Sequence, residues 1–465
     1  MPPLAPIPLL APAPPGGATP ELFRSKPPEL LRLQRMLAAR RQSVAAAGRR
    51  AAAGSRPGRA GSQSGGASNA SSGGASRAAS GGSGGAGEPG GADDLETPIR
   101  VSPIALHGRG AVSNPQTRFD ALRRHAEDDG WFNEDGDAPA LRTEIVEEQA
   151  RSIITRNQSP DIPFNLAINP YRGCEHGCIY CFARPYHTYL GLSAGLDFET
   201  RLYAKTNAAE RLRAELAARI YRCEPINIGD ATDPYQPIER RYRLMRSLIE
   251  VMAECRQPFT IVTKSSLIER DIDLLAPMAR QGLVAVYMTI TTLDPDLGRR
   301  LEPRATAPWR RLETVRRLRE AGIPVGVSMG PIIPFLNEPE IESLLQAASD
   351  AGAQGAFYTV LRLPLELREL FIEWLNAHYP QRAKRVLARL TDMRSADGVE
   401  RLNDARFFKR MKGEGGWAEL IRLRFRMAQR KLGLDRHRLD LRCDLFQAPA
   451  SAQPQRVDDP QMGLF

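Results

Sequence analysis

Six short apolar runs, each separated from the next by a helical pattern, constrain the fold of this chain more than any other feature. The runs are rich in β-branched and aromatic residues and span 164–169, 226–230, 259–264, 284–291, 325–330 and 356–363. Continuous apolar runs of this kind are typical of parallel sheets, whose strands need crossover connections. The alternation therefore predicts an α/β fold, a partial (β/α)6 TIM-like barrel, with its chemistry at the carboxyl ends of the strands.

Composition divides the rest of the chain. The first hundred residues are dominated by Ala, Gly, Ser, Pro and Arg, and such a segment buries too little apolar surface to offset the entropy of ordering it. Helical patterns follow the last strand. The expected parts are a disordered tail at 1–115, a lead-in at 116–163, the barrel core at 164–365, a C-terminal helical extension at 366–446 and a flexible tail at 447–465.

The positive charge lies mostly in the N-terminal tail. Residues 1–100 hold twelve Arg and Lys and six Asp and Glu, which is +6 of the formal net charge of +10. One interpretation is a loose arm that binds the phosphates of nucleic acid. The alternative is an Arg-rich coding bias or an over-extended start, with Met36 as the true first residue.

The N-terminus and the cysteines indicate the compartment. The opening "MPPLAPIPLLAPAPP" lacks a basic segment and carries prolines throughout, so it fits neither a secretory signal nor a membrane helix. Three of the six cysteines are clustered, which argues against a disulfide framework. We expect a cytoplasmic protein with no membrane partner.

The clustered cysteines lie in "NPYRGCEHGCIYCFARP", directly after the first expected strand. Cys174, Cys178 and Cys181 stand in one short loop at the expected active face. Three thiolates can hold a metal or cluster and leave one coordination position open, as catalytic sites require. The alternative is a closed zinc site completed by His176 or His187.

The CxxxCxxC spacing, with an aromatic residue before the last cysteine and after strand one of a six-unit β/α series, resembles the radical S-adenosylmethionine (radical SAM) superfamily. The resemblance implies that the three cysteines bind three irons of a [4Fe–4S] cluster and that S-adenosylmethionine occupies the fourth. It also implies reductive cleavage of S-adenosylmethionine to a 5′-deoxyadenosyl radical, which abstracts a hydrogen atom from the substrate.

The resemblance extends over residues 164–365 and is closest to the branch of spore photoproduct lyases and DNA repair photolyase-like proteins. It implies contacts to the cofactor from the motifs "NIGDATDP", "IVTKS" and "MTITT". The matching residues are Tyr180 for the adenine, Gly229 and Asp230 for the amine, Lys264 for the carboxylate, Thr289 and Thr291 for the ribose, and Arg304 and Ser328 as further members. Structural alternatives exist, because Asp230 also suits a turn cap and threonines are good strand formers.

The loop after the second strand, "TDPYQPIE", has two prolines that stiffen it at the active face. We expect its polar residues to line the pocket: Asp233, Tyr235, Gln236 and Glu239.

One departure from the family pattern concerns the hydrogen-atom donor. Photoproduct lyases carry a cysteine shortly after strand two, whereas residues 230–233 read Asp, Ala, Thr, Asp. Cleavage of spore photoproduct itself is therefore not implied. Cys223 and Cys255 are interpreted as apolar filling, and together with Cys443 they are too scattered to form the ligand loop of a second cluster.

Two C-terminal features concern partners. Arg422, Arg424, Arg426, Arg430 and Lys431 suggest a face that follows phosphates, with a solvated helix surface as the alternative. The last residues, "QMGLF", resemble the pentapeptide that binds the bacterial sliding clamp, with Gln461, Leu464 and Phe465 as its anchors. The alternative for this segment is a frayed terminus that packs back on the barrel.

The sequence thus favours a radical SAM enzyme that acts on nucleic acid in DNA repair or modification. It would need an electron donor for its cluster, and DNA and the sliding clamp are the other expected partners. The alternatives are a radical SAM enzyme that modifies protein or RNA, and a non-catalytic zinc-binding adaptor for nucleic acid.

Overall fold

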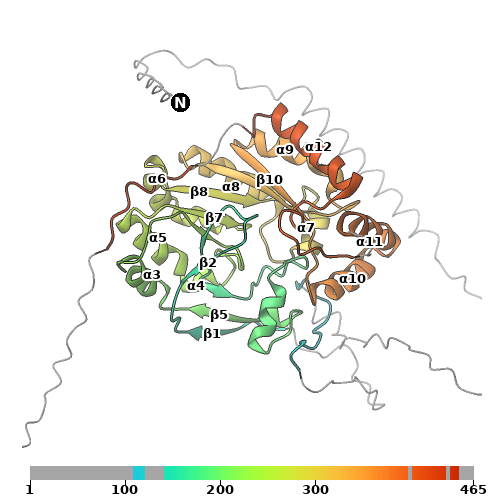
Figure 1. Cartoon of the computed structure of the whole chain (residues 1–465), viewed down its shortest axis with the longest axis horizontal. Helices are drawn as coiled ribbons and strands as arrows, with labels where there is room; N and C mark the ends of the chain where they lie inside the picture. The colour runs from blue at the N-terminus through green and yellow to red at the C-terminus, as the bar shows by residue number, and fades with distance from the viewer. Residues whose placement is uncertain (1–107, 121–140, 396–400, 436–439, 450–465) are drawn as a thin grey trace, which may run out of the picture. The chain divides into compact units, whose positions relative to one another are not determined.

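Figure 1 shows the computed structural model, which describes residues 108–120, 141–395, 401–435 and 440–449. Most of the expected N-terminal tail and the clamp-like pentapeptide lie outside these residues.

The main sheet has seven strands in the order β10-β9-β8-β7-β6-β3-β2. Six of them run parallel and follow chain order, which confirms the partial (β/α)6 barrel. The seventh, β2, pairs antiparallel with β3 at the edge and was not expected. The strands of this sheet are β2 (Ile154–Arg156), β3 (Leu166–Ile168), β6 (Ile226–Ile228), β7 (Phe259–Thr263), β8 (Val284–Thr289), β9 (Val325–Ile332) and β10 (Gly355–Val360).

The two faces of this sheet differ in burial. On the outer face Ile228, Ile261 and Val286 are fully buried, and α6 and α8 pack against it. On the inner face Val262 and Tyr287 are only half-buried. The covering helices alternate with the strands because each parallel pair needs a crossover. They are α3 (Ala208–Leu216), α4 (Glu239–Tyr242), α5 (Leu244–Cys255), α6 (Ile272–Arg280), α7 (Pro295–Leu301), α8 (Pro308–Glu320) and α9 (Ile341–Asp350), with 3₁₀ turns η2 (Ser266–Asp271) and η3 (Glu338–Glu340).

A second, smaller sheet has the order β1-β5-β4 and lies below the main sheet in Figure 1. Its strands β1 and β5 are parallel, and β4 joins β5 antiparallel. The sequence analysis assigned β1 to the lead-in and β4 and β5 to the barrel core, and it missed this sheet because β1 is largely exposed and β4 has only two residues. The elements here are β1 (Glu144–Glu148), β4 (Tyr171–Arg172), the 3₁₀ helix η1 (Arg184–Leu190), α2 (Asp197–Thr200) and β5 (Arg201–Lys205).

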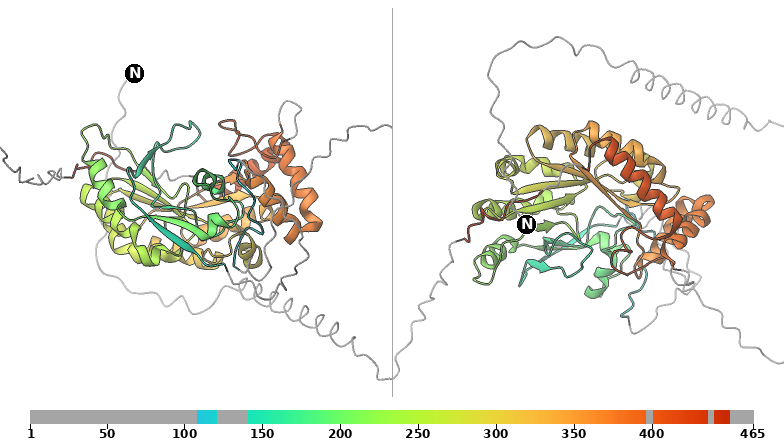
Figure 2. Two further views of the ribbon diagram at one scale, coloured as in Figure 1. Left: turned by 90° about the horizontal axis from the view of Figure 1, so that it is seen from below. Right: turned by 45° about the horizontal axis from the view of Figure 1, so that its top comes forward.

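Three helices follow β10 and form the expected C-terminal extension: α10 (Leu367–His378), α11 (Pro380–Arg394) and α12 (Gly415–Lys431). α11 packs between α10 and α12, and α12 also contacts α9. Figure 2 shows this group from two further sides, at the β10 end of the barrel. The extension therefore closes the series of β/α units on the side where the last strand ends.

Candidate active site

The cysteine loop follows β3 and β4, at the carboxyl ends of the parallel strands. Cys174 and Cys178 are buried, Cys181 is half-buried, and all three are free thiols. The backbone N–H of Cys174 donates to the carbonyl of Phe198 at 2.9 Å, and that of Cys181 donates to the carbonyl of Cys178 at 3.2 Å. The loop thus presents three thiols from a backbone that is fixed by its own hydrogen bonds.

A fully buried ion pair between Arg184 and Glu199 supports the cysteine loop. The guanidinium of Arg184 donates to the carbonyls of Gly177 and Cys178 and to the carboxylate of Glu199. Glu199 also accepts the backbone N–H groups of Gly110 and Ala111 at 2.9 and 2.8 Å. Residues 110–111 were assigned to the disordered tail, so ordered packing begins earlier than the sequence indicated.

Gly177 satisfies two demands of the loop at once. Its φ is +67°, a conformation that glycine adopts without a steric cost. A Cβ at this position would lie 2.7 Å from the Glu199 carboxylate. The glycine is therefore required both by the turn and by the close approach of the buried ion pair.

In the absence of a metal, burial favours the protonated thiols of Cys174 and Cys178. Burial, and then the charge of Asp233, raises the pKa of Cys174 well above its ordinary value. Burial raises the pKa of Cys178 to about 12, and the nearby Lys264 ammonium opposes this shift. A cation next to Cys178 favours its thiolate form, which is the form that ligates iron.

Lys264 and Asp233 meet beside the cysteine loop, from the ends of two neighbouring strands. The Lys264 ammonium lies 5.9 Å from the centre of the Tyr180 ring. Burial alone would lower its pKa, but Cys178, Glu302 and Asp233 together raise it. Lys264 is therefore a fixed cation in the position that the sequence analysis expected, where it faces the thiols.

Asp233 accepts hydrogen bonds from the hydroxyl of Thr263 and the backbone N–H of Lys264, both at 2.7 Å. Its carboxylate lies 3.3 Å from Nδ1 of His176, within the cysteine loop. Burial alone would raise the pKa of Asp233, but His176 and Lys264 hold it well below its ordinary range. Asp233 thus ties the end of β7 to the cysteine loop.

Gly229 and Asp230 lie at the end of β6, as expected. The Asp230 carboxylate accepts from the side-chain amide of Asn169, whose oxygen accepts the N–H of Ala231 at 3.1 Å. Burial raises the pKa of Asp230. The φ of Gly229 is +94°, and a Cβ there would lie 2.5 Å from the carbonyl of Val262.

A buried polar network that the sequence analysis missed joins Tyr180 to β8. The Tyr180 hydroxyl bonds to Glu302 and lies 3.1 Å from the hydroxyl of Thr291, which donates to Glu302 at 2.6 Å. The second Glu302 oxygen pairs with Arg311. Burial alone would raise the pKa of Glu302, but Arg311 and Lys264 hold it at about 2.

Thr289 and Ser328 face each other across the β8–β9 register, and both are buried. Arg304 lies apart from them, half-exposed, and its guanidinium pairs with Glu175 at 2.9 Å. The structure thus gathers the expected residues at one end of the sheet, with Arg304 on the outer side of the cysteine loop.

The expectation that the polar residues of the "TDPYQPIE" loop line the pocket is wrong for three of the four. Tyr235, Gln236 and Glu239 are fully buried and bond inward. The Tyr235 hydroxyl donates to Asp271, and the Gln236 amide bridges the N–H of Glu175 and the carbonyl of Gly173. These side chains hold the loop and are not available to a ligand, because fully buried polar groups are already paired.

Two further interpretations made from the sequence can be compared with the observed contacts. Arg424 was one candidate for a phosphate-binding face, with a solvated helix surface as the alternative, and it pairs with Glu338 and Glu342 and so joins α12 to α9. Cys223 was interpreted as an apolar filler, yet its thiol donates to the side-chain oxygen of Gln257 at 3.7 Å and lies near the thiol of Cys443. The long separation of these two cysteines in the sequence concealed the contact.

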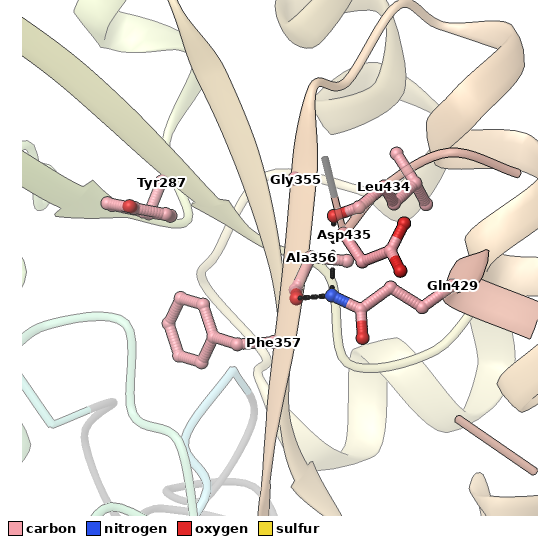
Figure 3. A pocket seen from close by; sticks show the side chains of 7 residues that line it. All are labelled: Tyr287, Gly355, Ala356, Phe357, Gln429, Leu434 and Asp435. Atoms are coloured by element: carbon pink, nitrogen blue, oxygen red, sulfur yellow. Dashed lines mark hydrogen bonds between the residues drawn. The ribbon is translucent and has the colours of Figure 1, made fainter. Parts of the chain in front are cut away.

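A pocket of about 180 Å³ lies away from these residues, at the first residues of β10. Figure 3 shows the Gln429 amide bonded to the carbonyls of Ala356 and Leu434, with the Tyr287 and Phe357 rings on the other side of the strand. None of the expected cofactor residues lines it. It does not belong to the candidate active site.

Comparison with known proteins decides the family. Residues 168–348, which span the cysteine loop and strands β6 to β9, match the sequence model of the radical SAM superfamily. Residues 168–348 form a domain of the radical SAM superfamily. Radical SAM proteins use a [4Fe–4S] cluster and S-adenosylmethionine, so these are the cofactors of this chain.

Relatives of this radical SAM chain occur in bacteria and archaea. An uncharacterised protein of Mycobacterium tuberculosis (strain ATCC 25618 / H37Rv) is 38% identical over 226 residues, which is 48% of this chain and 66% of the relative. The alignment thus leaves about a third of that relative unmatched. An uncharacterised protein of Methanocaldococcus jannaschii is 25% identical over 52% of this chain and 85% of the relative.

Among solved radical SAM structures, spore photoproduct lyase complexed with dinucleoside spore photoproduct is 16% identical, with a TM-score of 0.46 over 62% of this chain and 79% of that chain. Spore photoproduct lyases form the branch that the sequence motifs resemble. At this identity the likeness does not extend to activity.

The residues present fit the radical SAM cofactors. Three free thiols share one loop, and a fixed cation and two carboxylates with lowered pKa values lie next to them. Nδ1 of the buried His176 lies 3.3 Å from the Asp233 carboxylate but forms no hydrogen bond of good geometry among the described residues. Within the same residues, no three His, Cys, Asp or Glu side chains gather around a single metal ion. Each thiol of the loop can instead ligate a different iron.

His187, one of the two histidines considered for a zinc site, faces away from this chemistry. Its Nε2 lies 2.9 Å from the carbonyl of Arg201, and burial lowers its pKa to about 4. Its ring packs against Phe198 and Tyr203. His187 therefore supports the small sheet.

In the part of the chain that the structure describes, no helix is long and apolar enough to cross a membrane.

Proposed function

We propose that this radical SAM enzyme acts on nucleic acid, in DNA repair or modification. The observation that carries the radical chemistry is the buried loop of three free thiols at the strand carboxyl ends, next to the fixed cation of Lys264. When bound, the cluster and S-adenosylmethionine supply a 5′-deoxyadenosyl radical that abstracts a hydrogen atom from the substrate.

The residues of this chain divide the work of holding these cofactors. Cys174, Cys178 and Cys181 ligate three irons. Lys264 holds the carboxylate of S-adenosylmethionine, and Gly229 and Asp230 at the end of β6 receive its amine.

Tyr180, Thr289, Thr291 and Ser328 would hold the adenine and ribose of S-adenosylmethionine. Glu302 fixes the Tyr180 ring and the Thr291 side chain through its hydrogen bonds. Tyr180 and Thr291 therefore do not need to reorganise when the nucleoside binds.

Two features support nucleic acid as the substrate. The strand-end motifs resemble those of the photoproduct lyase branch, and the N-terminal tail carries most of the positive charge. Residues 230–233 contain no cysteine, so the substrate need not be spore photoproduct and the hydrogen-atom donor must differ. The proposal also includes a cytoplasmic location for the protein and a cellular electron donor for its cluster.

The test is anaerobic reconstitution with iron and sulfide, followed by a dithionite-driven assay for 5′-deoxyadenosine. We expect about four irons per chain and 5′-deoxyadenosine as a product. About one bound zinc per chain and no product would favour the zinc-binding adaptor.

The Cys181→Ala variant tests the thiol assignment in the same assay. It should lose cluster iron and S-adenosylmethionine cleavage together, because one iron loses its ligand. Cys255→Ala is the matched control, since Cys255 is a buried cysteine at the end of α5, outside the cysteine loop. Iron content that is unchanged in Cys181→Ala contradicts the assignment.

A further inference from the structure

We propose that Phe182, Tyr186 and Arg362 form a binding surface for a single nucleic-acid strand, with a base stacked on the exposed rings and a phosphate on Arg362. This inference rests on the proposed function and names the part of the chain that presents the substrate to the radical site.

The three side chains lie at the mouth of the barrel, next to the last cysteine. Phe182 directly follows Cys181 in the chain, and Tyr186 lies on η1. The two rings contact edge to face, with their centres 6.4 Å apart. Arg362 comes from the other side, just after β10 ends, and its guanidinium lies 5.6 Å from the centre of the Phe182 ring.

The rings are exposed to an unusual degree for large aromatic side chains. Phe182 is 39% exposed and Tyr186 is 54% exposed. Burial raises the pKa of Tyr186. The next largest effects on this pKa come from the charges of Arg362, Asp230 and Arg410. Tyr186 thus lies near both the cationic residues and the expected amine-binding residue Asp230.

The Arg362 guanidinium lacks an anionic partner among the described residues. Its Nε is buried without a hydrogen bond, and its terminal nitrogen reaches only the sulfur of Met411 at 3.7 Å. Burial, and then the charge of Arg410, lowers its pKa. An arginine with free donors in a partly desolvated position is suited to bind a phosphate.

Two neighbouring arginines, Arg394 and Arg410, differ from Arg362 in their hydrogen-bond partners. Arg410 is paired with Asp161 through two hydrogen bonds of 2.7 and 2.5 Å. Arg394 donates to the carbonyls of Val360 and Leu361, and also to two carbonyls of the 401–413 loop. These two arginines are used in fixing the loop through bonds to protein oxygens, although Nε of Arg394 is also unpaired, whereas Arg362 makes no hydrogen bond to an oxygen of the described residues.

The 401–413 loop extends the surface. The N–H of Val360 donates to the carbonyl of Met411 at 2.8 Å, which fastens the loop to the end of β10. Phe407 and Phe408 are 49% and 65% exposed, and Arg410 lies over the Phe407 ring at 4.9 Å. Exposed rings next to cations on both sides of the mouth match the stacking platforms of proteins that bind single strands.

The chemistry favours a nucleic-acid strand over an acidic peptide. An acidic peptide offers carboxylates to Arg362 but gives the exposed rings no planar group to stack on. A nucleotide satisfies both, since every base has a π face and each nucleotide carries a phosphate.

The experiment measures binding of fluorescein-labelled oligothymidine to the full-length reconstituted enzyme by fluorescence anisotropy at several salt concentrations. Arg362→Gln should weaken binding about tenfold and lower the slope of log affinity against log salt by about one. Tyr186→Ala should weaken it about tenfold through the lost ring. Tyr186→Phe should bind like the wild type, because it keeps the ring.

Arg316→Gln is the matched control, because Arg316 is an exposed arginine paired with Glu313 on α8. It should change neither the affinity nor the salt slope. Wild-type affinity in both Arg362→Gln and Tyr186→Ala overturns the inference, and so does equal competition by polyglutamate. The basic tail is the same in all variants, so it does not affect their comparison.

The 5′-deoxyadenosine assay on the same preparation separates this inference from the proposed function. If the wild type forms no 5′-deoxyadenosine while its oligonucleotide binding depends on Arg362, only the radical chemistry fails. If it forms 5′-deoxyadenosine and its oligonucleotide affinity does not depend on Arg362 or Tyr186, only the inference of a strand-binding surface fails.

Discussion

Glu302 is the residue of the site that the sequence concealed. It stands in "RRLEPRA" with no motif around it, yet it bonds to Tyr180, Thr291 and Arg311 in the buried network. A buried carboxylate with three partners is costly to desolvate and is retained where it fixes other groups. Tyr180 and Thr291 were predicted from the family motif, but their common anchor required the fold.

The Glu302→Gln variant tests this role through pH. The pKa of Glu302 is about 2 in the folded protein against an ordinary value of 4.5. Its charge therefore stabilises the fold above pH 4.5, and this contribution is lost as the pH falls towards 2. At pH 7 the variant should lose about 3–5 kcal/mol of unfolding free energy, because Arg311 stays buried without its partner.

Urea unfolding at pH 7 and at pH 3 measures the effect. The gap between variant and wild type should narrow at the lower pH. Glu313→Gln, on the surface of α8, is the control and should cost less than about 1 kcal/mol. A gap of the same size at both pH values contradicts the assignment of the low pKa to Glu302.

Lys264 is the second prediction at the scale of one residue. Lys264→Ala should keep its iron but bind S-adenosylmethionine about 10- to 100-fold more weakly, because a charge-assisted hydrogen bond is worth about 1.5–3 kcal/mol. Equilibrium titration of the reconstituted protein measures this. Lys384→Ala on the exposed side of α11 is the control, and equal affinity in both variants removes Lys264 from the cofactor site.

Among the elements, the cysteine loop depends most on contacts from outside itself. The loop was predicted from its spacing and from its place after the first strand. The Arg184–Glu199 pair that supports it, and the contacts of Glu199 with Gly110 and Ala111, join segments that are distant in the sequence. No local pattern signals such a pair.

Replacement of Arg184 by Met tests the support of the loop. Glu199 would stay buried without its cation, so the unfolding free energy should fall by about 3–5 kcal/mol. Arg213→Met breaks the exposed pair with Glu254 and should cost less than about 1 kcal/mol. Chemical denaturation compares the two, and equal losses would show that the buried pair has no special role.

For the whole molecule, the C-terminal pentapeptide gives a prediction that involves a partner. Deletion of residues 461–465 should abolish co-elution with purified sliding clamp on size-exclusion chromatography, because Leu464 and Phe465 are its apolar anchors. The segment lies outside the described residues, so the prediction rests on its sequence. Gln461→Ala, which keeps both anchors, should weaken the contact without abolishing it. Clamp binding that persists after the deletion assigns the contact elsewhere.

The sequence by itself determined the barrel, the cysteine loop and the strand ends that hold the expected cofactor residues. These features are encoded locally, by the period of apolar residues and by the spacing within a motif. Strand β7, "FTIVT", needs no distant contact to be recognised. The small sheet β1-β5-β4 was missed, since its half-exposed strands show no such period and are stabilised by pairing.

Only the tertiary structure decided which polar residues face the ligand and which hold the frame. Asp233 and Glu239 lie in the same short loop, yet one reaches the cysteine loop and the other pairs with Arg270 in the core. Arg362 and Arg410 both lie outside the helices and strands, but only Arg410 has a carboxylate partner among the described residues. These differences depend on distant segments brought together by folding, and a linear pattern does not carry that information.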